Sequence, residues 1–147
     1  MVSLIEYRHY WEGILERIPE IRSLIPVTVD QDISHHVSSI TVEELPVLFL
    51  VVPEAQGTGA NADAYSDRNE AMVLLADKYD PQRSMGAYSL LENLQPLIER
   101  VKETILADMA AGCPLLADVD IRSIHTAPVS SLYNILAGWM LSFNFQS

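Results

Sequence analysis

The chain has 147 residues, of which 49% are hydrophobic and 20% are charged, and its formal net charge is −11. This length and composition predict one globular domain, residues 1–147, and exclude a disordered chain. The nine basic residues are scattered singly. Nucleic acids and anionic membranes are bound through clustered Lys and Arg, so neither is expected as a partner.

Signals for secretion and membrane insertion are missing from the sequence. Residues 1–10 carry Glu6, Arg8 and His9, where a signal peptide needs an apolar core. The longest apolar run, 45–52, is far shorter than the roughly 20 residues of a membrane helix. The single cysteine leaves no internal disulfide. We therefore expect a soluble cytoplasmic protein.

The first expected element is an amphipathic helix from residue 3 to about residue 18. Its apolar residues recur at spacings of three and four, which gives the helix one buried face. Ser3 is expected to cap the helix, with Glu6 completing a capping box, and Pro19 to end it.

Two strands are expected in the next part of the chain. Residues 27–39 are ambiguous, because alternating valines are followed by polar residues typical of a turn. A short helical turn is expected at 41–45. The apolar runs 47–52 and 70–79 then predict strands that pair antiparallel, the first of them buried on both faces.

The segment between these strands, 54–68, is small and polar and is predicted to be a long loop. Loops of this length are usually functional or mobile. Residues 57–62 match a loose dinucleotide fingerprint, but no apolar helix follows to receive a pyrophosphate, so nucleotide binding is not expected. We interpret the loop as an interaction segment. Its candidate contact residues are Gln56, Gly57, Thr58, Gly59, Asn61, Asp63, Tyr65 and Arg68.

A long helix, 84–111, is expected after the second strand, with one continuous apolar stripe. Ser89 and Glu92 form a second candidate capping box. Pro96 is expected to kink the helix or mark a late start, and Gly112 to end it.

Two further strands complete the predicted sheet. Residues 118–126 alternate as in a strand and are followed by a loop at 127–134. The aromatic-rich segment 132–145 is expected to be the central strand, with Gly138 at a bulge or a close backbone approach. The predicted fold is α+β: a single antiparallel or mixed sheet of about four strands, with the N-terminal helix and the long helix on one face.

No catalytic or metal-binding constellation stands out in the sequence. His35 and His36 are adjacent, and on a strand they would point to opposite faces, which does not suit one metal ion. Asp30 and Asp32 begin like a calcium loop that lacks its Gly and Glu. Cys113 follows a helix C-terminus, which is not the setting of a nucleophilic thiol. We expect no cofactor, no metal and no enzymatic activity.

Aromatic residues are candidates either for a ligand pocket or for the core. Their periodic positions favour the core. They are Tyr7, Tyr10, Trp11, Trp139 and Phe143.

The layout and the ending of the chain carry a family resemblance. The matching parts are the N-terminal helix, the 47–52 strand, the 84–111 helix and a final hairpin with Asn134, Gly138, Trp139, Phe143 and Phe145. Together they resemble the tail-terminator, or tail-completion, proteins of bacteriophages and prophages. The resemblance implies a structural protein without an active site, which forms a homo-oligomeric ring at the head-proximal end of a tail tube. It also implies that loop 54–68 contacts neighbouring subunits, that other tail or assembly proteins are partners, and that the protein is assembled into a virion-like particle.

Two other functions stay open. The first is a binding module for a small apolar ligand or a protein partner. The ligand or partner would lie between the sheet and the long helix, in a cavity near Trp139. An enzyme would draw its residues from the loop and the sheet edge, with Asp67, Asp77 and His125 as the candidates.

Overall fold

The computed structural model describes residues 1–28, 30–79, 82, 86–132 and 135–147. Within these ranges, five strands form one sheet in the order β1-β2-β3-β5-β4. The strands are β1 (Ser23–Val27), β2 (Val47–Thr58), β3 (Ser66–Lys78), β4 (Val119–Leu132) and β5 (Leu136–Gln146). The helices are α1 (Leu4–Arg17), α2 (Asp30–Val37) and α3 (Gly86–Ala110), with short 3-10 turns at Val42–Glu44, Ala62–Ala64 and Pro114–Leu116.

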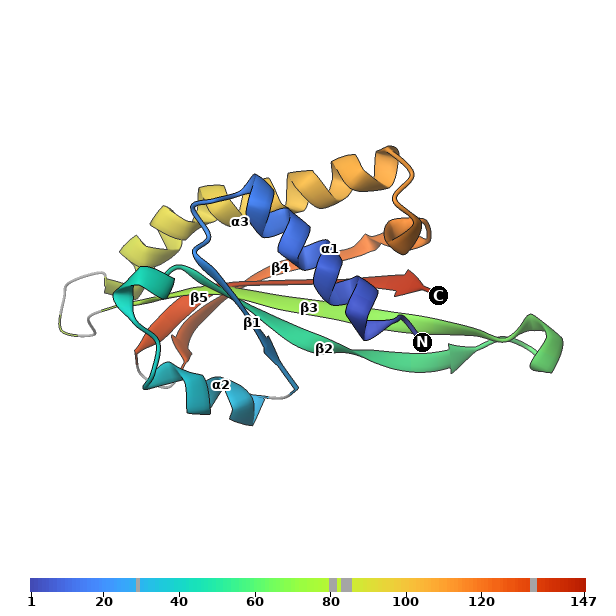
Figure 1. Ribbon diagram of the computed structural model, residues 1–147, viewed down its shortest axis with the longest axis horizontal. Coiled ribbons are helices and arrows are strands. Elements are labelled where there is room, and N and C mark those ends of the chain that lie inside the picture. Colours follow the sequence, from blue (N-terminus) through green and yellow to red (C-terminus); the bar gives the residue numbers. More distant parts are fainter. Residues whose placement is uncertain (29, 80–81, 83–85, 133–134) are drawn as a thin grey trace.

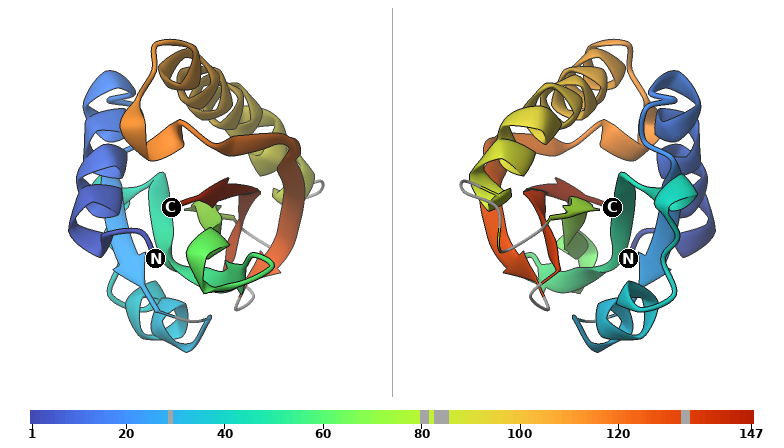
Figure 2. Two further views of the ribbon diagram at one scale, coloured as in Figure 1. Left: turned by 90° about the vertical axis from the view of Figure 1, so that its right-hand side faces the viewer. Right: turned by 90° about the vertical axis from the view of Figure 1, so that its left-hand side faces the viewer.

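The predicted α+β class is confirmed. The sheet is mixed, because β1 pairs parallel with β2 and the other neighbours pair antiparallel. Helices α1 and α3 cover one face of the sheet, as expected, and α2 packs on the other face (Figures 1 and 2).

The start of β2 is the centre of the core, and the burial on both faces predicted for 47–52 is confirmed for residues 47–50, whereas Val51 is half-buried and Val52 is exposed. Val47 and Phe49 are fully buried in the cluster shared with α2. Leu48 and Leu50 lie in the larger cluster under α1 and α3. Because successive side chains of a strand point to opposite faces, a continuous apolar run is what a doubly covered strand needs.

Helix α1 begins and ends as the sequence predicts. The Ser3 hydroxyl accepts a hydrogen bond from the Glu6 backbone N–H at 3.4 Å, and the helix ends at Arg17, before Pro19. Tyr7, Trp11 and Ile14 form its buried face.

A polar clamp joins α1 to the C-terminal part of α3. The Arg17 guanidinium donates to both carboxylate oxygens of Asp108, at 2.8 and 2.7 Å, and the Tyr10 hydroxyl donates to the same carboxylate at 2.9 Å. The hydrogen bonds from Arg17 hold the pKa of Asp108 below its usual range. Burial, with the hydrogen bond to Asp108 next in importance, raises the pKa of Tyr10.

Two glycines fulfil their predicted roles. Gly112 follows α3 with a φ of 80°, the left-handed conformation that ends a helix. Gly138 on β5 lies against β3, where a Cβ atom would collide with the carbonyl oxygen of Leu75. This is the close backbone approach expected from its position.

Several expected boundaries are wrong. The segment 54–68 is not a long loop, because β2 continues to Thr58 and β3 begins at Ser66. Likewise, β4 runs on to Leu132 through the expected loop 127–134. The final strand, β5, begins at Leu136 and is flanked by β3 and β4, so β3 and not β5 occupies the middle of the sheet.

Two elements were not predicted at all, one ending where the ambiguous region 27–39 begins and one lying within that region. Strand β1 forms an edge of the sheet, and α2 contains His35 and His36, which therefore lie on a helix and not on a strand.

Helix α3 begins at Gly86 and continues through Pro96. Ser89 and Glu92 therefore lie inside the helix and do not form a capping box at its start. Some sequence predictions concern residues outside the described part of the structure. They are Val29, Asp80, Pro81, Ser84, Asn134 and the side chains of Asp30 and Asp32.

Candidate functional site

The predicted interaction segment forms a projecting hairpin, residues 54–70, which we call the arm. Its strands are the outer ends of β2 and β3, paired from Glu54 opposite Glu70 to Thr58 opposite Ser66. Figure 1 shows that the arm extends beyond the helices at one end of the sheet. Strand β1 stops opposite Val51, so in the described part of the chain the outer edge of β2 has no strand beside it from there on.

The turn of the arm is held by side-chain hydrogen bonds. The Asn61 side-chain oxygen accepts from the backbone N–H groups of Asp63 and Ala64, both at 3.1 Å. The Thr58 hydroxyl donates to the Ser66 carbonyl at 3.1 Å. Gly59 has a φ of 131°, and a Cβ atom there would collide with the Ala64 carbonyl oxygen. The tip is therefore a built structure that requires glycine at this position.

Tyr65 covers Gly57 on the opposite strand. A Cβ atom on Gly57 would lie 2.8 Å from a ring carbon of Tyr65, so the absence of a side chain makes room for the ring. The Tyr65 hydroxyl donates to Asp67 at 2.6 Å, and this hydrogen bond raises the pKa of Tyr65. Despite these contacts, Tyr65 is 63% exposed. An aromatic ring over a strand glycine is a known device for stiffening a hairpin.

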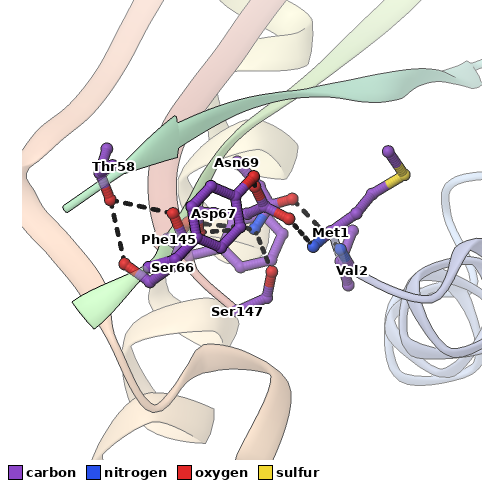
Figure 3. Close-up of polar contacts among 9 residues, drawn as sticks. Met1, Val2, Thr58, Ser66, Asp67, Asn69, Phe145 and Ser147 are labelled. Carbon is purple, nitrogen blue, oxygen red and sulfur yellow. Dashed lines mark hydrogen bonds and ion pairs between the residues drawn. The ribbon is translucent and has the colours of Figure 1, made fainter. Parts of the chain in front are cut away.

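Asn69 anchors the root of the arm, as Figure 3 shows. It is fully buried, and its side-chain oxygen accepts from the Val2 backbone N–H at 3.2 Å. Its amide nitrogen donates to the Ser147 hydroxyl at 2.8 Å and to the Phe145 carbonyl at 3.4 Å. A buried amide on β3 that is satisfied by Val2 and by the C-terminal segment 145–147 fixes both of these segments to β3.

Asp67 forms a second anchor beside Asn69. Its carboxylate pairs with the α-amino group of Met1, and its backbone exchanges hydrogen bonds with Ser147 at 3.0 and 3.2 Å (Figure 3). The hydrogen bond from Met1, followed by the one from Tyr65, lowers the pKa of Asp67. The arm is thus fastened at its root to residues near both ends of the sequence.

The eight predicted contact residues fall into two groups. Gly57, Thr58, Gly59 and Asn61 build the arm, since their contacts lie within it. The side chains of the other four are available at the arm surface: Gln56, Asp63, Tyr65 and Arg68.

Sequence reasoning missed the polar side chains that accompany Gln56 and Arg68. Glu54, Glu70 and Asn144 join them around a polar hollow of about 280 Å³. Asn69 was also missed, although a signal existed: it lies two residues before Ala71, on the buried face of the same strand.

The candidate catalytic residues are not brought together. Asp67 and Asp77 lie on one strand, and ten residues of strand span roughly 33 Å. His125 is opposite Ser142, which in turn is opposite Met72, about midway between the two aspartates. Burial raises the pKa of Asp77, but Asp77 shares no cleft with the other two residues. Among the residues that the structure describes, no group of three or more His, Cys, Asp or Glu side chains is placed to hold a metal ion.

The side chain of Trp139, beside which a cavity was considered, reaches from β5 to α3. The ring packs against the main core, and the indole N–H donates to the Leu91 carbonyl of α3 at 2.9 Å. An apolar groove of about 200 Å³ lies elsewhere, between α1 and the sheet edge formed by β1 and β2. We call this the edge groove, and its lining residues are Leu4, Tyr7, Arg8, Pro26, Leu50, Val51, Val52 and Pro53.

Comparisons with known proteins do not assign the chain to a family. No protein-family model matches it, and no curated protein is significantly similar to it. None of the helices within the described ranges combines the length and the apolar character needed to cross a bilayer.

Proposed function

We propose that the protein is a non-enzymatic structural subunit of phage or prophage origin, which self-associates into a ring in the manner of a tail terminator. The arm is the element that contacts the neighbouring subunit. The family resemblance of the sequence and the geometry of the arm support this proposal from separate directions.

The observation that carries the proposal is that the arm is held in its conformation by several hydrogen bonds yet contributes little to the core. Its β2 residues from Glu54 to Gly57 are exposed, whereas Val47 to Leu50 on the same strand are buried. An exposed two-stranded ribbon is only marginally stable by itself. In this chain it is reinforced by Tyr65, Asn61 and the buried amide of Asn69.

Pre-organisation of this kind suits a binding element. A segment that already holds its bound conformation loses less conformational entropy on association than a loop that must become ordered. Arms that reach from one subunit to the next also fit the heterologous contacts of rings, where one patch meets a different patch of the neighbour.

A shortened arm tests the proposal. Replacing Thr58–Ser66 by Asn-Gly joins Gly57 to Asp67, which lie directly opposite each other, through a two-residue hairpin turn. The anchors Asp67 and Asn69 are kept, so the body is expected to fold unchanged, which circular dichroism and thermal unfolding check.

Light scattering across protein concentration then compares the two proteins. The wild type is expected to form one discrete oligomer, and the shortened variant to associate at least roughly tenfold more weakly, as expected when contacts worth about 1.4 kcal/mol or more are removed. A wild type that stays monomeric at every concentration would refute self-association. An oligomer of unchanged mass and affinity in the variant would refute the role of the arm tip.

A further inference from the structure

The edge of the sheet formed by β4 presents an isolated apolar side chain. Ile121 is 63% exposed and is flanked by Asp120 and Arg122, which are also exposed. It begins an irregular stretch, 121–124, that separates the pairs Asp120–Asn144 and His125–Ser142. Bulges of this kind redirect side chains and interrupt regular pairing at an edge.

This bulge is a defined structure, held by its own hydrogen bonds. The Asp120 carboxylate accepts from the Arg122 backbone N–H at 3.0 Å. The Ser123 hydroxyl donates to the Asp120 carbonyl at 2.6 Å and accepts from the Asn144 backbone N–H at 2.7 Å. Side chains thus replace the missing ladder bonds, and Ile121 is presented from a fixed backbone.

The opposite edge of the sheet carries the edge groove. The groove lies where β1 ends and β2 continues, paired with β3 on its other side. Two residues of its lining, Leu4 and Val52, are 50% and 36% exposed. Its volume of about 200 Å³ suits one aliphatic side chain, and its lining is mostly apolar. Figure 2 shows that β1 and β4, which mark the two edges, lie on opposite sides of the molecule.

The groove and the bulge lie at the same level along the strands. One cross-strand row runs from Val51 of β2 through Met72 and Ser142 to His125 of β4. A second row, two residues away on β3 and β5, runs from Glu54 through Glu70 and Asn144 to Asp120. The exposed residues Ile121 and Arg122 therefore lie at one end of the rows whose other end borders the groove.

Charges around the two features are complementary. Arg8 lines the groove, and Glu54 directly follows its last residue, Pro53. Ile121 has an acid on one side and a base on the other. In the described part of the chain, Arg8 has one ion pair, with Glu12 at 3.4 Å, and both side chains of that pair are about half exposed. Such a surface pair is weak enough to yield to an intersubunit partner.

We propose that Ile121 of one copy inserts into the edge groove of the next copy, with Asp120 facing Arg8 and Arg122 facing Glu54. The contact is heterologous, so it generates either a closed ring or an open filament. Because both patches lie at one level along the strands, successive copies are placed side by side without a shift along the strand direction. That is the condition for closure into a ring. The free edge of the arm then runs beside β4 of the neighbouring copy.

This inference rests on the proposed self-association and adds the surfaces that it uses. Cysteine crosslinking tests it in the full chain, with Cys113 replaced by serine. The variant that combines Ile121→Cys with Val52→Cys places one thiol at each proposed surface. Mild oxidation is expected to give a ladder of covalent multimers that ends at the oligomer, visible on a non-reducing gel and reversed by reductant.

Matched variants make the outcome decisive. The pair Ile121→Cys and Val42→Cys keeps two exposed thiols but moves one to a residue that is 80% exposed and remote from the groove lining, and it is expected to give no ladder. Ile121→Asp is expected to weaken association by roughly tenfold or more, whereas Ile121→Val retains it. Since Ile121 is mostly exposed, neither change is expected to disturb folding.

Failure of this inference is distinguishable from failure of the proposed function. An oligomer that forms without the Ile121–Val52 crosslink, and that tolerates Ile121→Asp, would overturn the docking surfaces and leave self-association standing. A wild type that does not associate would overturn both.

Discussion

The inner and outer halves of the β2–β3 ladder have the same antiparallel pairing but opposite environments. Val47 to Leu50 are buried on both faces, with α1 and α3 above them and α2 below. Glu54 to Gly57, only a few residues farther along the same strand, are exposed. A register shift between Val51 and Glu54 marks the boundary between the two halves.

The comparison shows that the same hydrogen-bonded ladder serves two purposes. In the inner half, the free energy of folding comes from apolar burial, which contributes about 25 cal/mol for each Å² removed from water. The outer half has little such burial and depends on its anchors and on continuity with the inner half. Its exposed surface is therefore available for contacts with another molecule.

The largest expected effect is on the free energy of unfolding, when side chains of the inner and outer halves are replaced by alanine. Phe49→Ala removes a fully buried ring and is expected to lower the free energy of unfolding by about 3–5 kcal/mol. Gln56→Ala, on the exposed half of the same strand, is expected to change it by less than about 0.5 kcal/mol. Urea unfolding monitored by circular dichroism measures both. Equal losses would show that the arm is part of the folding core.

The anchor of the arm is expected to have an intermediate effect. Asn69→Ala leaves the Val2 N–H without its partner and removes the bond to Ser147, so a loss of about 1–3 kcal/mol is expected. Hydrogen exchange within the arm is also expected to accelerate. Gln146→Ala is the control, because this side chain is exposed. If the two variants have the same stability and exchange, Asn69 does not anchor the arm.

The clamp between α1 and α3 gives a pH-dependent test of the body. Arg17 lowers the pKa of Asp108, so the stabilisation is present above the unfolded-state pKa of about 3.9 and is lost as pH falls through the lower folded-state pKa. Asp108→Asn is expected to cost about 1 kcal/mol at pH 7, a modest value because Arg17 is 47% exposed.

The difference between Asp108→Asn and the wild type should shrink below pH 4, which thermal unfolding across pH measures. Asp118→Asn, at an exposed position, is the control and is expected to show no such convergence. A cost that stays constant down to pH 3 would mean that the ionised Asp108 carboxylate is not what stabilises the clamp.

The smallest effect on global stability is expected at the tip of the arm. Gly59→Ala introduces a Cβ atom against the Ala64 carbonyl oxygen in a left-handed conformation, so the turn must rearrange. Hydrogen exchange at 58–66 is expected to accelerate, while the melting temperature changes little. Gly13→Ala is the matched control. A Cβ atom there meets no neighbour within 4 Å, and the helix is expected to gain about 0.5–1 kcal/mol. A large drop in melting temperature for Gly59→Ala would mean that the tip folds with the core.

The sequence predicts best where burial is periodic. The double burial predicted for 47–52 is confirmed for 47–50, although Val52 is 36% exposed. The stripe of the long helix and the close backbone approach at Gly138 are also confirmed, and each follows from spacing or size. Helix α2 was not predicted because its first residues, Asp30, Gln31 and Asp32, resemble a turn. The four-residue spacing of Ile33 and Val37, both buried, was the signal for it.

The arm could not be predicted as a strand, because small and polar residues have low strand propensity. The β2–β3 pairing of the core continues into the arm and keeps it extended. Hydrogen bonds with residues near the two ends of the sequence, such as Val2 and Ser147, also hold it. The extension of β4 beyond residue 126 was not predicted either, because of its own composition. Pro128 argues against a strand, and it is tolerated here because β4 lies at the sheet edge.

Class averages of the wild-type protein in negative-stain electron microscopy test the central claim most directly. A rigid arm and two complementary edges at one level along the strands predict closed rings of a single subunit number. An absence of rings at every protein concentration, with light scattering showing only monomers, or open filaments with a rise between subunits, would contradict this account.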